Sequence, residues 1–203
     1  KMTDDEENVN KLKKDIGERE VLLLLPGRSV IKEKAKIDAY TAAHHPVVIG
    51  VNAVFEGYSY DYVFFSNKGR YEYAQEIYPE LFERFPRIVA SNIKTVPEAQ
   101  EILVNFNLLI KRGWSHFDNS GIMCLRLLNR LHVTNVSLAG FDGFGGAHDE
   151  NYADASLPYI DPGKDWEDLN AEIKDMLSDF KNMTNDFMKI RFLTESRFEL
   201  SDQ

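Results

Sequence analysis

Short apolar runs recur along the chain, and polar segments separate them. The first run, residues 21–25 (VLLLL), stops at Pro26-Gly27, which is typical of a strand buried in a parallel sheet. Runs of the same kind predict further strands, at 46–51, 61–65, 87–90, 134–139 and 188–193. Residues 100–110 (QEILVNFNLLI) are ambiguous. Their apolar positions alternate with period two, which favours a strand, and a helix is the alternative.

Helices are predicted between most of these strands. The first covers residues 29–43, with Ser29 as its N-cap. Its side chains expected to face inward are those of Ile31, Ala35, Ile37 and Tyr40. Further helices are predicted at 71–78, where Pro79 ends the helix, and at 118–131 and 166–180. Because strands and helices alternate, we expect an α/β sandwich with a mostly parallel sheet.

The N-terminal segment and the net charge limit the class of protein. Residues 1–19 are acidic and then basic, and they predict a charged linker or a solvated N-terminal helix ahead of a domain at 20–203. Lys1 precedes Met2, so we expect a piece cut from a longer polypeptide. The net charge of −9 argues against a nucleic-acid partner.

Two absences bear on the compartment. The chain has one cysteine, Cys124, so it can form no internal disulfide, which fits a reducing cytoplasm. We expect Cys124 to be a buried apolar residue without a nucleophilic role. The longest apolar run is too short to cross a bilayer, so we expect no membrane partner.

Small polar residues follow the predicted strands or open the next helix. In open α/β sheets ligands bind beyond the carboxyl ends of the strands, so we expect these residues to line one crevice. The candidate ligand-binding residues are Gly27, Arg28, Ser29, Asn52, Ser66, Asn67, Ser120, Gly121, Gly140 and Asp142.

The turn at Pro26–Ser29 is a candidate phosphate site. Gly27 allows a close approach to backbone, a helix N-terminus attracts anions, and Arg28 can pair with a phosphate. The alternative is a tight strand–helix turn that Ser29 caps. The turn matches neither a P-loop nor the dinucleotide fingerprint.

Two further segments could either bind a ligand or have a purely structural role. Ser120 opens a second helix that could point into the crevice, or its neighbour Asn119 simply caps that helix. Asp142 could bind a ribose hydroxyl or a metal, or it could be an Asx-turn residue.

The long loop at residues 140–162 is of a length often found in functional lids. Its segment AHDENYAD contains His148, Asp149, Glu150 and Asp154. Their spacing matches no strong metal template, so we predict a solvated loop and no metal site.

The order of these segments resembles a known family. A Gly-x-Ser turn is followed by VN (51–52), YDYVFFSN (60–67), NSGIMCLRLL (119–128) and VTNVSLAGFDGF (133–144). This resembles the bacterial lipooligosaccharide sialyltransferases and related sialyltransferase-like domains, which have a Rossmann-like fold and bind CMP-sialic acid. The resemblance therefore implies a Rossmann-like three-layer sandwich.

The chain is also similar to a domain that follows HMG-CoA-lyase-like aldolases of the 4-hydroxy-2-oxovalerate aldolase type. The segments GKDWEDLNAEIKDML (163–177) and IRFLTESRFEL (190–200) are closer to that domain than to the transferases. This resemblance implies an upstream aldolase (lyase) domain in the same bacterial chain.

The resemblance also assigns roles to the candidate residues. Gly27 and Ser29 match the turn that touches the nucleotide phosphates, and Asn52 matches a residue that binds nucleotide or sugar. Ser66 and Asn67 match the end of the third strand. The remaining matches are the helix start against the nucleotide and the turn near ribose and base, which are Ser120-Gly121 and Gly140-Phe141-Asp142.

One departure from the family concerns catalysis. The transferases use a histidine base before the last long helix, but residues 157–170 contain none, and His148 lies too early. Asp161 or Asp165 could replace it only with a raised pKa. We therefore assign no catalytic residue and no certain cofactor. We expect an accessory domain that binds CMP, another nucleotide or another small phosphorylated ligand. The alternative is a nucleotide-sugar-dependent glycosyltransferase.

Overall fold

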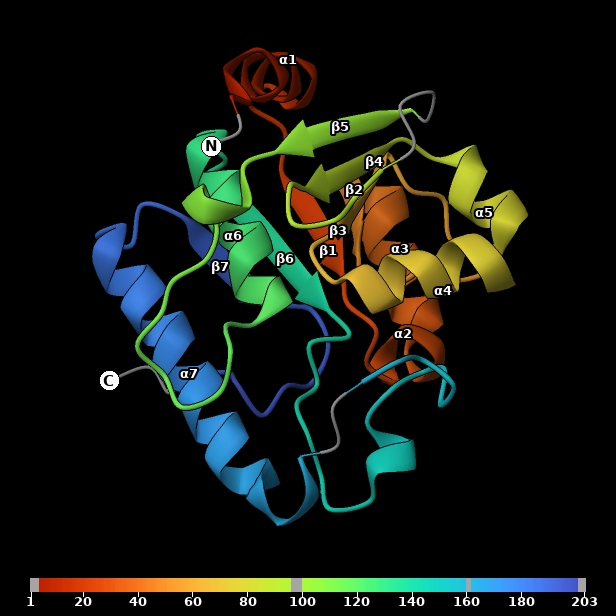
Figure 1. Cartoon of the computed structure of the whole chain (residues 1–203), viewed down its shortest axis with the longest axis vertical. Coiled ribbons are helices and arrows are strands. Elements are labelled where there is room, and N and C mark those ends of the chain that lie inside the picture. The colour runs from red at the N-terminus through yellow and green to blue at the C-terminus, as the bar shows by residue number, and fades with distance from the viewer. Residues whose placement is uncertain (1–3, 96–99, 160–161, 201–203) are drawn as a thin grey trace.

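A single parallel sheet organises the chain. The computed structural model describes residues 4–95, 100–159 and 162–200. Seven strands hydrogen-bond in the order β5-β4-β3-β2-β1-β6-β7, and each pair of neighbours is parallel (Figure 1). The strands are β1 (Val21–Leu24), β2 (Val47–Val51), β3 (Tyr62–Phe65), β4 (Arg87–Ala90), β5 (Glu101–Val104), β6 (Asn135–Ala139) and β7 (Lys189–Phe192). The predicted α/β fold with a parallel sheet is confirmed.

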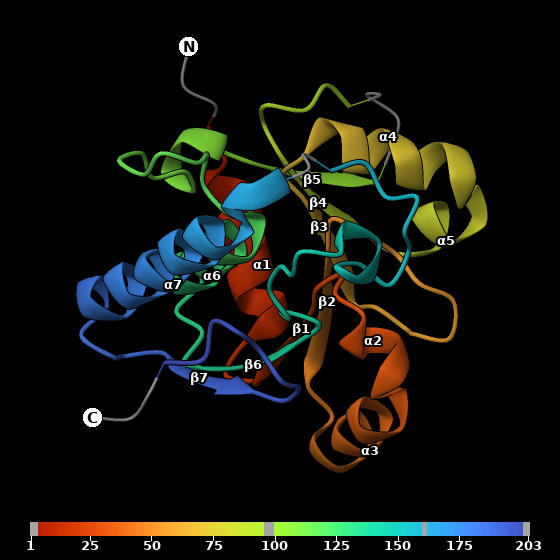
Figure 2. The same cartoon turned by 90° about the horizontal axis from the view of Figure 1, so that it is seen from below.

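Helices cover both faces of the sheet and make three layers (Figure 2). One face carries α1 (Glu6–Ile16), α6 (Ser120–Arg130) and α7 (Trp166–Met183). The other carries α2 (Ser29–Lys32), α3 (Lys34–His44), α4 (Lys68–Ile77) and α5 (Pro79–Arg84). Short 3-10 helices lie at η1 (Phe106–Leu108), η2 (His148–Glu150) and η3 (Gly163–Asp165).

Alternate residues of each strand supply the two cores. In β2, Val47, Ile49 and Val51 pack with the α1, α6 and α7 layer, whereas Val48 packs with the opposite layer. Both layers are apolar, which is why the central strands are buried at every position and read as continuous apolar runs.

The N-terminal helix α1 belongs to this packed domain. Its residues Val9, Leu12 and Ile16 are buried in the core, so the face they form is not solvated. The Asp5 carboxylate, just ahead of the helix, accepts two hydrogen bonds from the Arg130 guanidinium at 2.8 and 2.9 Å. Helix α1 is therefore fixed at its start by an ion pair and along its length by apolar contacts.

Three local predictions differ from the structure. The predicted helix at 29–43 is broken at Glu33 into α2 and α3, and Arg28 takes the N-cap position predicted for Ser29. Ile31 is 59% exposed and Ala35 also faces solvent, while Ile37 is buried as predicted.

Two other segments bear on the sequence predictions: Pro79 does more than predicted, and residues 100–110 decide between the two alternatives. Pro79 ends α4 as expected but also opens α5, at a first-turn position where a missing N–H costs nothing. The ambiguous residues 100–110 form strand β5 and then η1.

The connections create a switch point between β1 and β6. The chain leaves β1 through α2 and α3 on one face, and it leaves β6 towards α7 on the other (Figures 1 and 2). Diverging connections of this kind leave a crevice at the carboxyl ends of the two strands. Within the ranges that the structure describes, no helix is long and apolar enough to cross a membrane.

Candidate functional site

A cavity of about 320 Å³ opens at this edge of the sheet. Segments that follow β1, β2, β3 and β6 line it, together with the start of α6 and the long loop after β6. Most of the candidate residues line it, namely Gly27, Asn52, Asn67, Ser120, Gly121, Gly140 and Asp142. Ser66 lies directly behind them, with its Oγ 2.9 Å from that of Ser120. Arg28 and Ser29 instead line a neighbouring hollow.

The turn after β1 holds the chain's own carboxylate at the place where we expected a phosphate. The Ser29 N–H donates to Asp142 Oδ2 at 2.9 Å, and the Gly27 N–H donates to the Gly140 carbonyl at 2.9 Å. A Cβ on Gly27 would lie 2.3 Å from the Gly140 oxygen. Gly27 therefore lets two turns of the protein approach each other. This geometry favours the tight strand–helix turn, with Asp142 as its hydrogen-bond acceptor.

Asp142 separates the cavity from the neighbouring hollow, because it lines both. Burial raises the pKa of its carboxyl, and the hydrogen bonds from Ser29 offset part of that rise. Its Oδ1 is buried and has no hydrogen-bond partner in the described part of the chain. Asp142 thus presents a carboxylate to one wall of the crevice.

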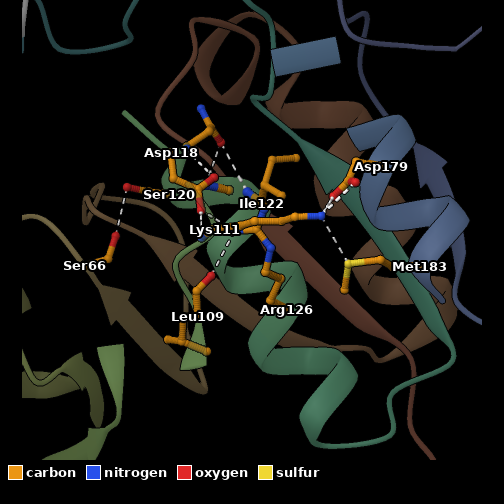
Figure 3. A network of polar contacts seen from close by, with 11 residues as sticks. Ser66, Leu109, Lys111, Asp118, Ser120, Ile122, Arg126, Asp179 and Met183 are labelled. Atoms are coloured by element: carbon orange, nitrogen blue, oxygen red, sulfur yellow. Dashed lines mark hydrogen bonds and ion pairs between the residues drawn. The ribbon is translucent and has the colours of Figure 1, made fainter. Parts of the chain in front are cut away.

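The start of α6 forms another wall and is held from both sides. Asn119 Oδ1 caps the helix by accepting from the backbone N–H groups of Gly121 and Ile122, at 2.8 and 3.2 Å. Asp118 pairs with the Arg126 guanidinium and accepts from the backbone N–H of Lys111 at 2.7 Å (Figure 3). The predicted cap and the predicted position at the crevice are therefore both present.

Two asparagines bring amide groups to the carboxyl ends of β2 and β3. Asn52 has a φ of 56°, a left-handed conformation that asparagine tolerates better than most residues. Its Oδ1 accepts from the backbone N–H of Ser66 at 3.0 Å. Asn67 Oδ1 accepts from the backbone N–H of Arg70 at 3.0 Å and caps α4. With both oxygens used in this way, the Nδ2 groups are the donors left for a ligand.

Arg70 is a lining residue that the sequence analysis missed. It is 7% exposed, and its Nε donates to the carbonyl of Pro158. Its guanidinium lies 4.8 Å from the ring centroid of Tyr152. Burial lowers the pKa of Arg70, while Tyr152 and Asp154 act to raise it. Arg70 Nη1 is buried and forms no hydrogen bond within the described ranges.

His116 is a second missed residue at the cavity. Its Nδ1 hydrogen-bonds the carboxylate of Glu172 on α7, and Glu172 Oε1 also accepts from the backbone N–H of Ser115 at 2.7 Å. Burial alone would raise the pKa of Glu172, but these hydrogen bonds outweigh burial and lower it. His116 is thereby held in one orientation at the rim of the crevice.

The segment that carries His116 is held along α7 by a row of carboxylates. Glu172 is followed on α7 by Asp175, which accepts from the indole Nε1 of Trp114 at 2.9 Å. One turn further, Asp179 accepts from Lys111 Nζ at 2.6 and 2.8 Å (Figure 3). The rim is therefore attached at successive points and depends on α7 for its position.

Aromatic side chains make the apolar part of the lining. They are Phe117, Phe141, Phe144, Tyr152, Tyr159 and Phe198. The ring centroids of Phe144 and Tyr152 are 6.1 Å apart, and those of Tyr152 and Tyr159 are 5.5 Å apart. Phe117, at the rim, is 68% exposed. A planar or apolar part of a ligand can pack against such rings.

The predicted lid is the loop between β6 and α7, and hydrogen bonds to other segments hold it in place. The Ala153 N–H donates to the Pro26 carbonyl at 2.9 Å. Asp154 accepts hydrogen bonds from the hydroxyls of Tyr73 and Tyr78 at 2.8 and 3.2 Å. The loop covers the crevice from the side of α4, and Asp154 links it to that helix.

The remaining candidates of this region add nothing to the cavity among the described residues. Asp161 and the side chain of His148 lie outside what the structure describes. Asp165 is the residue ahead of α7 and does not line the cavity. Across the described ranges, no three His, Cys, Asp or Glu side chains gather to hold a metal ion. Cys124 is buried as predicted, and burial raises the pKa of its thiol.

Comparison with known proteins adds no family. No protein-family model matches the chain, and no curated protein matches it. The resemblance to sialyltransferase-like domains and to the aldolase-associated domain therefore remains a prediction.

Proposed function

We propose that the crevice binds a small phosphorylated ligand, and that the ligand is a nucleotide, with CMP as the first candidate. The observation that carries this proposal is the buried, unpartnered Nη1 of Arg70 in the wall of the cavity. A buried charged donor without an acceptor is costly. An anionic group on a ligand would supply that acceptor.

The surroundings of Arg70 support a nucleotide over a bare anion. The N-terminus of α6 lines the same cavity and is an environment that favours negative charge. The amide groups of Asn52 and Asn67 offer donors for hydroxyl or base oxygens. The aromatic lining suits a planar base. These features together support a ligand that combines a phosphate, hydroxyl groups and a planar ring.

The proposal also says of which longer protein this domain would be a part. The resemblance of residues 163–177 and 190–200 supports an accessory domain of a bacterial, cytoplasmic aldolase chain of the 4-hydroxy-2-oxovalerate type. The test is to sequence the gene upstream of this segment. We expect the reading frame to continue upstream into an aldolase barrel, and an upstream domain of another fold would contradict this part of the proposal.

Ligand binding is tested by thermal unfolding with CMP, UMP, CDP, UDP, GDP and inorganic phosphate. A ligand at a hundred times its Kd stabilises the protein by about 2.7 kcal/mol. We expect at least one nucleotide to raise the Tm, and Arg70→Met to abolish that rise. Arg84→Gln, at an exposed arginine that stacks on Phe85, is the matched control and should leave the shift unchanged. Absence of a shift with every nucleotide would refute the proposal.

A further inference from the structure

Residues 111–118 form a loop at the mouth of the crevice, and side chains hold this rim loop in place. Within the described ranges, no backbone group of the rim loop hydrogen-bonds to another backbone group. Three of its residues, His116, Phe117 and Asp118, line the cavity. A segment with few protected backbone hydrogen bonds opens locally at a low free energy. The rim loop is therefore the part of the cavity wall that local opening reaches first.

Two points of the rim loop are anchored. Trp114 packs against the core, and its indole Nε1 donates to Asp175 on α7 at 2.9 Å. Asp118 accepts from the backbone N–H of Lys111 at 2.7 Å and pairs with the buried Arg126 of α6 (Figure 3). Each anchor joins a charged hydrogen bond to a contact with a buried group. We therefore expect both anchors to stay closed when a neighbouring contact opens.

Residues 115–117, between these anchors, depend on one carboxylate. The backbone N–H groups of Ser115 and His116 donate to Glu172 on α7 at 2.7 and 3.3 Å, and the His116 ring nitrogen Nδ1 binds the same carboxylate. In the described part of the chain, residues 115–117 form no other hydrogen bond. The side chain of Phe117 is 68% exposed. Glu172 is therefore the latch of a three-residue flap.

We propose that residues 115–117 are a flap that gates the crevice, and that the flap swings open between Trp114 and Asp118 when the contacts to Glu172 break. His116 and Phe117 line the cavity, so their displacement would widen its mouth. The inference goes beyond the proposed function, because it concerns entry into the crevice. It rests on the proposed function only for the identity of the ligand that enters.

Hydrogen exchange of the ligand-free protein tests the latch. Glu172→Ala removes the acceptor of both flap N–H groups, while alanine keeps the helix propensity of α7. We expect exchange in a peptide covering residues 112–118 to become about 10-fold to 100-fold faster, because hydrogen bonds to a charged group are lost. Exchange in α6 and in the sheet should stay at the rate of the parent protein, because both anchors remain.

Access to the crevice is measured with a thiol inside it. Ser120 lines the cavity, so Ser120→Cys in a Cys124→Ala background places the chain's single thiol there. We expect Ellman's reagent to label this thiol about 10-fold faster or more when Glu172→Ala is added. His116→Ala removes one contact of the latch and leaves α7 intact. It should raise the labelling rate in the same direction, and it covers the case in which Glu172→Ala does not fold.

Asp179 provides the matched control on the same helix. It binds Lys111 Nζ at 2.6 and 2.8 Å, outside the flap, so Asp179→Asn should change neither measurement. Labelling within about twofold of the parent rate in both latch variants would overturn the gate, as would faster exchange throughout the protein. Neither measurement uses a ligand. A failed gate therefore leaves the proposed function standing, and a crevice that binds no nucleotide leaves the test of the gate valid.

Discussion

Replacing Arg70 by methionine separates a ligand-binding residue from a structural one. Most buried arginines are paired, and removing one leaves a buried partner uncompensated at a cost of about 3–5 kcal/mol. Arg70 differs because its Nη1 has no partner in the described part of the chain. Methionine keeps an apolar stem of similar length. The variant should therefore lose nucleotide binding and destabilise the ligand-free protein by less than the loss of a paired arginine would.

The magnitude follows from the contacts of the guanidinium. Losing the hydrogen bond from Nε to the Pro158 carbonyl costs about 1.5–3 kcal/mol for a charged donor, and losing the contact with the Tyr152 ring costs about 0.5–2 kcal/mol. Removing the unpartnered charged donor returns about 1–3 kcal/mol or more. These contributions partly offset one another, and their midpoints leave a net destabilisation of about 1.5 kcal/mol, which is below the roughly 3–5 kcal/mol of a paired buried arginine.

Arg87 provides the comparison. It is also buried, but it pairs with the Glu101 carboxylate at 3.0 Å and donates to the carbonyls of Phe82 and Phe85. Arg87→Met leaves Glu101 buried without its partner and should destabilise the protein by about 3–5 kcal/mol. The assay is urea denaturation of both variants without ligand. Equal destabilisation of the two would refute the reasoning and make Arg70 a structural residue.

Three further predictions follow from single contacts. Gly27→Ala should destabilise the protein by about 1–3 kcal/mol or more in urea denaturation, because the added Cβ would meet the Gly140 carbonyl; an unchanged midpoint would contradict this. The pKa of Asp5 is lowered, since its hydrogen bonds outweigh the effect of burial, so its contribution to stability is present at neutral pH and lost as the pH falls through that lowered value. Asp5→Asn should accordingly flatten the acid limb of a stability–pH curve, and a parallel curve would be evidence against it. The Cys124 thiol should react with Ellman's reagent only after unfolding, because it is buried and its pKa is raised.

The sequence pattern predicted the sheet well because its strands are buried on both sides. A continuous apolar run such as residues 21–25 predicts a buried strand in any α/β protein, and the structure places it inside the sheet as β1, between β2 and β6. Tertiary contacts decided the cases that differ. Helix 29–43 breaks at Glu33, and nothing in the local pattern of Ile31 and Ala35 marks that break. The ion pair that fixes the start of α1 likewise joins Asp5 to Arg130, which is 125 residues away.

The candidate site was predictable where a rule about strand ends applies, and not elsewhere. Asn52 and Asn67 follow strands, so their place at the sheet edge could be inferred from the order of elements. Arg70 lies in the first turn of α4, in the polar segment SNKGRYEY, and its burial depends on the distant residues Tyr152 and Pro158. His116 becomes a candidate only beside Glu172, and the pairing of residues 56 apart leaves no periodic signal.

The charges that line the crevice favour one orientation of an anionic ligand. Asp142 lines the wall at the ends of β1 and β6 and disfavours a phosphate there, because like charges repel in a site of low dielectric. Asp118, at the start of α6, is neutralised by Arg126. Arg70 is the one lysine or arginine among the described residues that line the cavity. A phosphate bound as we propose would therefore lie away from the turn after β1 and close to α4 and the start of α6. In a protein with a net charge of −9, the anion binding that we propose would depend on this local arrangement and not on the overall field.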